Sequence, residues 1–241
     1  VDFLANASHE LRTPLTSLAG FIETLKGSAR DDPEARAKFL DIMEGQAQRM
    51  GGLINDLMSL SRIELSEHRP PSSTADMASI VGEVCDALMP VARGRSVVLE
   101  SSVPGNGLEV VGVSDELTQV VQNLIDNAIK YSDEGQHVRI VLRTGLPLGD
   151  AIRFAGRQWD DSGRMSIASA VGSTKGRFAA LRVSDDGPGI ARQHLPRLAE
   201  RFYRVDQGRG LQPGTGLGLA IVKHIVQTHG GALKIESMLQ K

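Results

Sequence analysis

Residues 8–15 of this 241-residue chain read SHELRTPL. On a helix, His9 presents an imidazole, Glu10 a carboxylate beside it, and Thr13 a hydroxyl on the face of His9, one turn further on. Pro14 removes a backbone donor and should bend the helix directly after this turn. An imidazole in solvent is mostly neutral at pH 7, because its ordinary pKa is about 6.5, and its free ring nitrogen can then attack an electrophile. An isolated helical histidine is more often structural, but these neighbours favour a reactive one.

The residues around this stretch predict two helices. Apolar side chains recur at three- and four-residue steps on both sides of a break at residues 27–33. One such hairpin has too small a core to stand alone, whereas two copies would bury both apolar stripes in a four-helix bundle. We therefore expect a homodimer through residues 1–67. The alternative, a hairpin packed onto the rest of the chain, is disfavoured by the polar stretch that follows.

Composition excludes several classes of protein. The chain has 27 Lys and Arg against 29 Asp and Glu, a net charge of -2, so it lacks the basic excess of a nucleic-acid-binding protein. Its single cysteine, Cys85, excludes an internal disulfide and fits a reducing compartment. No apolar run reaches the ~20 residues of a membrane-spanning helix. Because the first residues already continue the helix of His9, we expect this chain to be a fragment of a longer protein.

The pattern changes after the second helix. Residues 68–75 are polar and contain two adjacent prolines, which predicts an interdomain linker. Over residues 76–241, helical patterns alternate with β-like runs, which predicts an α+β domain with one sheet under several helices. Residues 143–175 show no clean period and look like an insertion.

Three polar residues share one face of a predicted helix in this second domain. Asn123, Asn127 and Lys130 follow each other at four and three residues. Carboxamide oxygens are suitable ligands for a hydrated Mg²⁺, and a lysine supplies a point charge to phosphates. The alternative, a solvated polar face, is equally compatible with this segment alone.

Two glycine motifs follow. Asp185 begins the run DDGPGI after a predicted strand, where it could accept a hydrogen bond from an adenine amine, although such a run is also common in ordinary turns. The run GTGLGLAIV over residues 214–222 predicts a glycine loop that leads directly into a helix, and the exposed N–H groups at the start of a helix favour binding of phosphate. Between them lie RFYRVD at residues 201–206 and a glycine-containing stretch at residues 207–213, which looks like a lid.

The order of these motifs resembles the ATP-binding domain shared by sensor histidine kinases, gyrase-type ATPases and related chaperones. With residues 8–15 included, the resemblance is to sensor histidine kinases of two-component systems over nearly the whole chain, and residues 17–25 look most like phosphate-regulon sensor kinases. The resemblance implies an α+β fold: a helical hairpin forming a dimeric four-helix bundle, then an α/β-sandwich ATP-binding domain. Against the family pattern, the connection at residues 143–175 is long, and we expect the sheet to lack a C-terminal edge strand. The resemblance also implies that this fragment is cytoplasmic and that the N-terminal part of a longer protein anchors it in the bacterial inner membrane.

The resemblance also implies an activity. ATP would phosphorylate His9, with Glu10 as the base, and the phosphoryl group would pass to an aspartate in the receiver domain of a response regulator. Thr13 would serve removal of phosphate from that regulator, and Arg204 would neutralise charge on the γ-phosphate. Two alternatives stay open: an ATPase of the same fold that drives a clamp, which would have no use for His9, and an ATP-binding regulatory scaffold.

The remaining implied roles concern the cofactors, ATP and Mg²⁺. Asp185 would read adenine, Asn127 and Asn123 would bind Mg²⁺, Lys130 would touch phosphate, and Tyr131 would line the base or ribose. The residues expected to shape the nucleotide pocket belong to the two glycine motifs: Gly187, Gly189, Gly214, Thr215, Gly216, Leu217 and Gly218.

Overall fold

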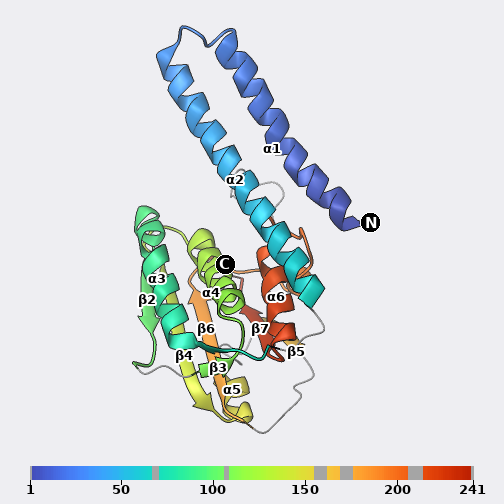
Figure 1. Cartoon of the computed structure of the whole chain (residues 1–241). Helices are drawn as coiled ribbons and strands as arrows, with labels where there is room; N and C mark the ends of the chain where they lie inside the picture. The colour runs from blue at the N-terminus through green and yellow to red at the C-terminus, as the bar shows by residue number, and fades with distance from the viewer. Residues whose placement is uncertain are drawn as a thin grey trace.

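The computed structural model describes residues 2–66, 71–105, 109–154, 162–168, 176–205 and 214–239. Its N-terminal part is a hairpin of two long helices, α1 (Asp2–Lys26) and α2 (Pro33–Ser66), which projects from the rest of the chain (Figure 1). Asp32 caps α2, because its Oδ1 accepts from the backbone N–H groups of Glu34 and Ala35 at 3.1 and 3.0 Å. The two predicted helices and the break between them are confirmed. None of the described helices is long and apolar enough to cross a membrane.

The second part, here called the α/β domain, has helices packed on a sheet. Strand β4 is central, with β2 parallel on one side and β6 antiparallel on the other, while β1 pairs with β3 and β5 with β7, both antiparallel. Its elements are β1 (Thr74–Asp76), α3 (Met77–Gly94), β2 (Val98–Ser102), β3 (Glu109–Val111), α4 (Ser114–Tyr131), β4 (His137–Leu146), α5 (Leu148–Phe154), β5 (Gly163–Ala168), β6 (Phe178–Asp185), the 3₁₀ turn η1 (Leu195–Arg197), α6 (Gly218–Thr228) and β7 (Ala232–Ser237).

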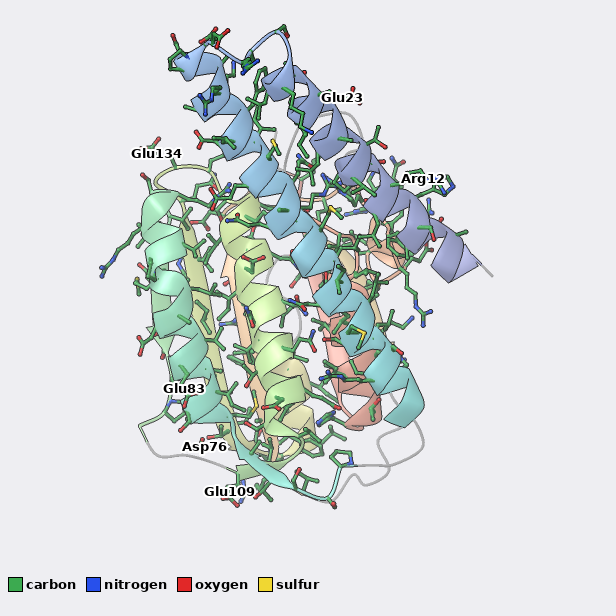
Figure 2. The ribbon with its side chains drawn as sticks, turned by 45° about the horizontal axis from the view of Figure 1, so that its top comes forward. Arg12, Glu23, Asp76, Glu83, Glu109 and Glu134 are labelled. Carbon is green, nitrogen blue, oxygen red and sulfur yellow. The ribbon has the colours of Figure 1, made fainter. Side chains whose placement is uncertain are left out.

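The sheet and helices α3 and α4 share an apolar core. Val81 of α3, Val121 and Ile125 of α4, and Val138 and Ile140 of β4 are fully buried in it. Figure 2 shows Asp76 at the start of α3, where its Oδ1 accepts from the N–H groups of residues 78 and 79 at 2.8 and 3.4 Å. The α+β architecture is confirmed, but the described strands pair into one three-stranded and two two-stranded sheets, whereas the sequence predicted a single sheet. Strand β1 begins at Thr74, inside the predicted linker, so the linker ends earlier than residue 75.

The segment expected to be an insertion contains two regular elements. Helix α5 packs against β4 and β6, where the Cζ atoms of Arg143 and Arg182 lie 4.7 and 4.6 Å from the centroid of the Phe154 ring. Strand β5 pairs with β7 from Gly163↔Ser237 to Ala168↔Ala232. The last described strand therefore has its partner inside residues 143–175, of which 155–161 and 169–175 lie outside the described residues.

The hairpin packs onto the α/β domain along α2. The lower half of α2 lies beside α6 (Figure 1), and Leu53, Leu60 and Ile63 enter one apolar cluster with α6 residues such as Ile221 and Ile225. We call this set the interdomain cluster. The sequence pattern disfavoured a hairpin packed on the rest of the chain. The structure shows this packing for one face of α2, because its apolar stripe meets the apolar face of α6.

Candidate functional site

The imidazole of His9 lies on an exposed part of α1. The hydroxyl of Thr13, also exposed, donates to the backbone carbonyl of His9 at 3.3 Å. Glu10 turns to the other helix of the hairpin, where its Oε2 lies 3.5 Å from Nη2 of Arg49. The structure therefore brings His9, Glu10 and Thr13 into consecutive turns as predicted, and adds a cation from α2.

The polar face of α4 is turned to the glycine loop, residues 214–218, because its apolar face is held on the sheet. A Cβ built on Gly214 would lie 2.2 Å from Nζ of Lys130, and one on Gly218 would lie 3.2 Å from Oδ1 of Asn123 and 3.8 Å from Nδ2 of Asn127. These glycines leave room for the three predicted ligand side chains. Nδ2 of Asn123 is buried and has no hydrogen-bond partner among the described residues. An unpaired amide N–H group is suited to an acceptor such as a phosphate oxygen. The oxygen of the Asn123 amide, which faces Gly218, and that of Asn127 are the atoms that could hold a hydrated cation.

Positive charge converges on the same place. Partial burial lowers the pKa of the Lys130 ammonium group; Asp126 opposes this effect, while Arg204, Arg49 and Arg95 add to it. The guanidinium of Arg95 donates to the backbone carbonyl of Lys130 at 3.0 Å, and this hydrogen bond holds Arg95 at the C-terminal end of α4. A cation cluster held in this way is suited to a multiply charged anion such as a triphosphate. The predicted lid at residues 207–213 lies outside the described residues.

The first glycine motif forms a tight turn beside the end of α4. Oδ1 of Asp185 accepts from the N–H of Gly187 at 3.0 Å. Partial desolvation raises the pKa of the Asp185 carboxyl, the Gly187 N–H opposes this, and the charge of Asp186 adds to it. Asp186 itself is paired with Arg139 at 3.0 Å, and this hydrogen bond lowers its pKa. Asp185 is therefore the better placed of the two carboxylates to accept from a ligand.

The glycines of this turn are needed for contacts within the chain. A Cβ on Gly187 would lie 2.7 Å from the carbonyl oxygen of Tyr131, and one on Gly189, at φ +76°, would lie 2.0 Å from that of Met238. Both close approaches are to protein backbone, so this turn needs the two glycines for its own packing. The ring of Tyr131 is 46% exposed at the mouth of the site, with Nζ of Lys130 5.2 Å from its centroid.

The second glycine motif, residues 214–218, borders the nucleotide pocket and also contacts helix α2. Gly216 has φ +71°, and its carbonyl accepts from the N–H of Phe202 at 2.9 Å. The Leu217 side chain is fully buried in the interdomain cluster, so only its backbone is available to a nucleotide. The Thr215 hydroxyl donates to Oδ2 of Asp56 at 2.6 Å and accepts from the N–H of Leu217 at 3.2 Å. Two of the residues predicted to bind nucleotide therefore serve the contact between the two domains.

Sequence reasoning missed two residues of α2. Arg49 and Asp56 lie seven positions apart, hence on one face of the helix, together with Leu53 and Leu60 of the interdomain cluster. Polar residues within an otherwise apolar stripe are the signal that could have marked them.

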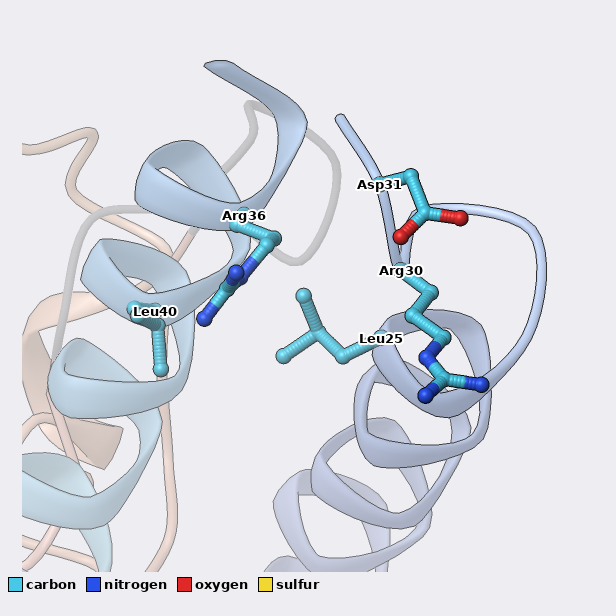
Figure 3. Close-up of a pocket in the computed structure, with 5 residues that line it drawn as sticks. All are labelled: Leu25, Arg30, Asp31, Arg36 and Leu40. Atoms are coloured by element: carbon cyan, nitrogen blue, oxygen red, sulfur yellow. The ribbon is translucent and has the colours of Figure 1, made fainter. Parts of the chain in front are cut away.

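A cavity of about 410 Å³ lies elsewhere, at the tip of the hairpin (Figure 3). It is lined by side chains from the end of α1 and the start of α2: Leu25, Arg30, Asp31, Arg36 and Leu40. None of the motif residues contributes to it, so it is separate from the nucleotide pocket.

Comparison with known proteins agrees with this arrangement. Residues 112–241 match the family of histidine kinase-, DNA gyrase B- and HSP90-like ATPases, and residues 1–66 match the His Kinase A (phospho-acceptor) domain. The chain belongs to the sensor histidine kinases, as the order of its motifs predicts.

Relatives share both domains with this chain. It is 34% identical to the phosphate regulon sensor protein PhoR of Pseudomonas aeruginosa over 98% of this chain and 47% of that protein. It is also 34% identical to the sensor-like histidine kinase SenX3 of Mycolicibacterium smegmatis, over 98% of this chain and 53% of that protein. The chain thus spans about half the length of these relatives. The predicted likeness to phosphate-regulon sensor kinases is confirmed by the first of them.

A solved structure supports the fold. Histidine kinase ThkA, in complex with response regulator protein TrrA, superposes with a TM-score of 0.62 at 18% identity, covering 98% of this chain and 61% of that chain.

Proposed function

We propose that this chain uses ATP to phosphorylate its own His9 and then passes the phosphoryl group to an aspartate of a response regulator. The observation that carries this proposal is the presence, in one chain, of an exposed imidazole beside a carboxylate and of a pocket where Asn123, Asn127 and Lys130 face a glycine loop. A clamp-driving ATPase or an ATP-binding scaffold would have no need of the first half of this arrangement.

The residues divide the reaction between them. The ring nitrogen of His9 attacks the γ-phosphorus, the bond to the β–γ bridging oxygen breaks, ADP leaves, and Glu10 takes the ring proton. Asp185 accepts from adenine, and Lys130 and Arg204 counter the charge of the phosphates. When bound, Mg²⁺ would be held through Asn127 and Asn123 and would neutralise phosphate charge.

The proposal requires the α/β domain to move relative to the hairpin. The Thr215–Asp56 hydrogen bond and the interdomain cluster hold the glycine loop against α2. Release of this packing would let the domain carry the γ-phosphate to His9.

A second copy of the chain is the proposed partner of the hairpin's other face. Large apolar side chains are exposed along both helices: Leu15, Ile22, Leu40, Ile54 and Met58. A homodimeric four-helix bundle would cover them. The chain covers about half of these relatives, which supports the further proposal that it is part of a longer protein. We propose that this longer protein is anchored in a membrane and that the present chain is its cytoplasmic part.

Incubation with γ-labelled ATP tests the central proposal. Acid-labile, base-stable label should appear on the intact chain and be absent from His9→Ala. His137→Ala is the matched control, because His137 lies on β4 and pairs with Glu100 instead. Label that persists in His9→Ala would refute the assignment.

A separate experiment addresses Thr13. We expect Thr13→Ala to keep His9 labelling but to slow loss of phosphate from a phospho-regulator by about tenfold, the scale of one lost positioning hydrogen bond. Equal dephosphorylation rates would show that Thr13 serves only its bond to the helix backbone.

A further inference from the structure

One face of α2 is built to meet the α/β domain. Leu53 and Leu60 on this face are nearly fully buried in the interdomain cluster, and Asp56 between them accepts from the Thr215 hydroxyl. Arg49 begins the same face, seven residues before Asp56, which is ~10 Å along the helix axis. Arg49 therefore lies on the face of α2 that packs against the α/β domain.

Arg49 also meets the other helix of the hairpin. Its Nη2 lies 3.5 Å from Oε2 of Glu10, and the two side chains are 28% and 39% exposed. Helix α2, which carries Arg49, contacts both α1 and α6 (Figure 1). The charge of Arg49 is also felt at Lys130, whose pKa it helps to lower.

We propose that Arg49 is a catalytic cation of the phosphoryl transfer, exchanging its partner Glu10 for the γ-phosphate when a triphosphate fills the pocket. This inference rests on the proposed function. The exchange frees the Glu10 carboxylate to take the ring proton of His9 as the nitrogen–phosphorus bond forms and the bond to the bridging oxygen breaks. Arg49 keeps all its protons and supplies charge alone.

Electrostatics favours the exchange. Arg49 and Arg204 both act on Lys130 as like charges, and among the described residues Glu10 is the carboxylate that pairs with Arg49. A triphosphate brings several negative charges to the same place, and a guanidinium can bind two phosphate oxygens at once through its planar fork. ADP lacks the phosphate that Arg49 would reach, so Arg49 should distinguish ATP from ADP.

The test uses the full chain with Arg49→Gln, and Arg62→Gln as the matched control, since Arg62 is an exposed arginine of the same helix. Binding of a non-hydrolysable ATP analogue and of ADP is measured by calorimetry. Arg49→Gln should reduce the preference for the triphosphate several-fold, leave ADP affinity unchanged, and slow His9 labelling at saturating ATP by about 100-fold, the scale of one lost transition-state contact. Arg62→Gln should change none of these values.

A double variant separates this role from a purely structural one. If Arg49 only held Glu10 in place, Arg49→Gln would have no further effect on nucleotide preference in a Glu10→Gln background. We expect the loss of triphosphate preference to persist there. An unchanged ratio of triphosphate to ADP affinity in both backgrounds would overturn the proposal, whereas absence of label on the unaltered chain would refute the proposed function instead.

Discussion

Replacing Leu60 with alanine should separate the hairpin from the α/β domain without unfolding either one. Leu60 is 1% exposed and lies in the interdomain cluster with Leu217, Ile221 and Ile225, all fully buried. A buried Leu→Ala change costs about 2–5 kcal/mol through lost transfer free energy and the cavity left behind. Because the cluster joins the two domains, this cost falls on their docking, and at about 1.4 kcal/mol per tenfold the docking equilibrium should shift by roughly 30- to 4,000-fold.

Hydrogen exchange measured by mass spectrometry can detect this separation. Amides of α6 should exchange faster in Leu60→Ala, while those of β4, in the other core, should stay protected. Leu88→Ala is the matched control, because Leu88 is buried in the core between α3 and the sheet and its loss should weaken the α/β domain itself. If α6 exchanges at the same rate in Leu60→Ala as in the unaltered chain, or if β4 loses protection equally, the interdomain cluster does not hold the domains together.

Three further predictions concern single features. Burial raises the pKa of the Asp56 carboxyl; the Thr215 hydrogen bond opposes this rise and the charge of Asp126 adds to it, so the docked state binds a proton more readily than the undocked state. Docking should therefore strengthen as the pH falls through the raised pKa and weaken as the pH rises through it. In the Asp56→Asn variant, hydrogen exchange of α6 should not depend on pH in this way. Asp185→Asn should weaken ATP and ADP binding by about 2–4 kcal/mol, measured by calorimetry, and unchanged affinity in this variant would remove Asp185 from the site. In the unaltered chain, the nucleotide affinity should fall as acid protonates Asp185, and this should begin at a higher pH than for an aspartate with an ordinary pKa. Deleting residues 145–173 removes α5 and the strand that pairs with β7, so the melting temperature of the α/β domain, measured by calorimetry, should fall by more than about 5 °C. An unchanged melting temperature would show that residues 143–175 are a loop without a structural role.

Local sequence determined the parts of this protein in which neighbours along one element act together. The three- and four-residue spacing of Asn123, Asn127 and Lys130 places them on one face wherever α4 packs, and the apolar residues between them decide which face turns inward. The glycine-rich turns and the two helices of the hairpin follow from backbone preferences of the same short range. The family resemblance and the α+β architecture could therefore be predicted from the order of such segments.

Only the tertiary structure decided what each face meets. Apolar periodicity marks the stripe of α2 as buried, but a second hairpin and the face of α6 could cover it equally well, because apolar burial is non-directional. The same ambiguity concealed the core role of Leu217 and the pairing of β5 with β7. Arg49 beside Glu10, and Thr215 on Asp56 across 159 residues, depend on how two separately folded surfaces fit together, and no local pattern carries that information.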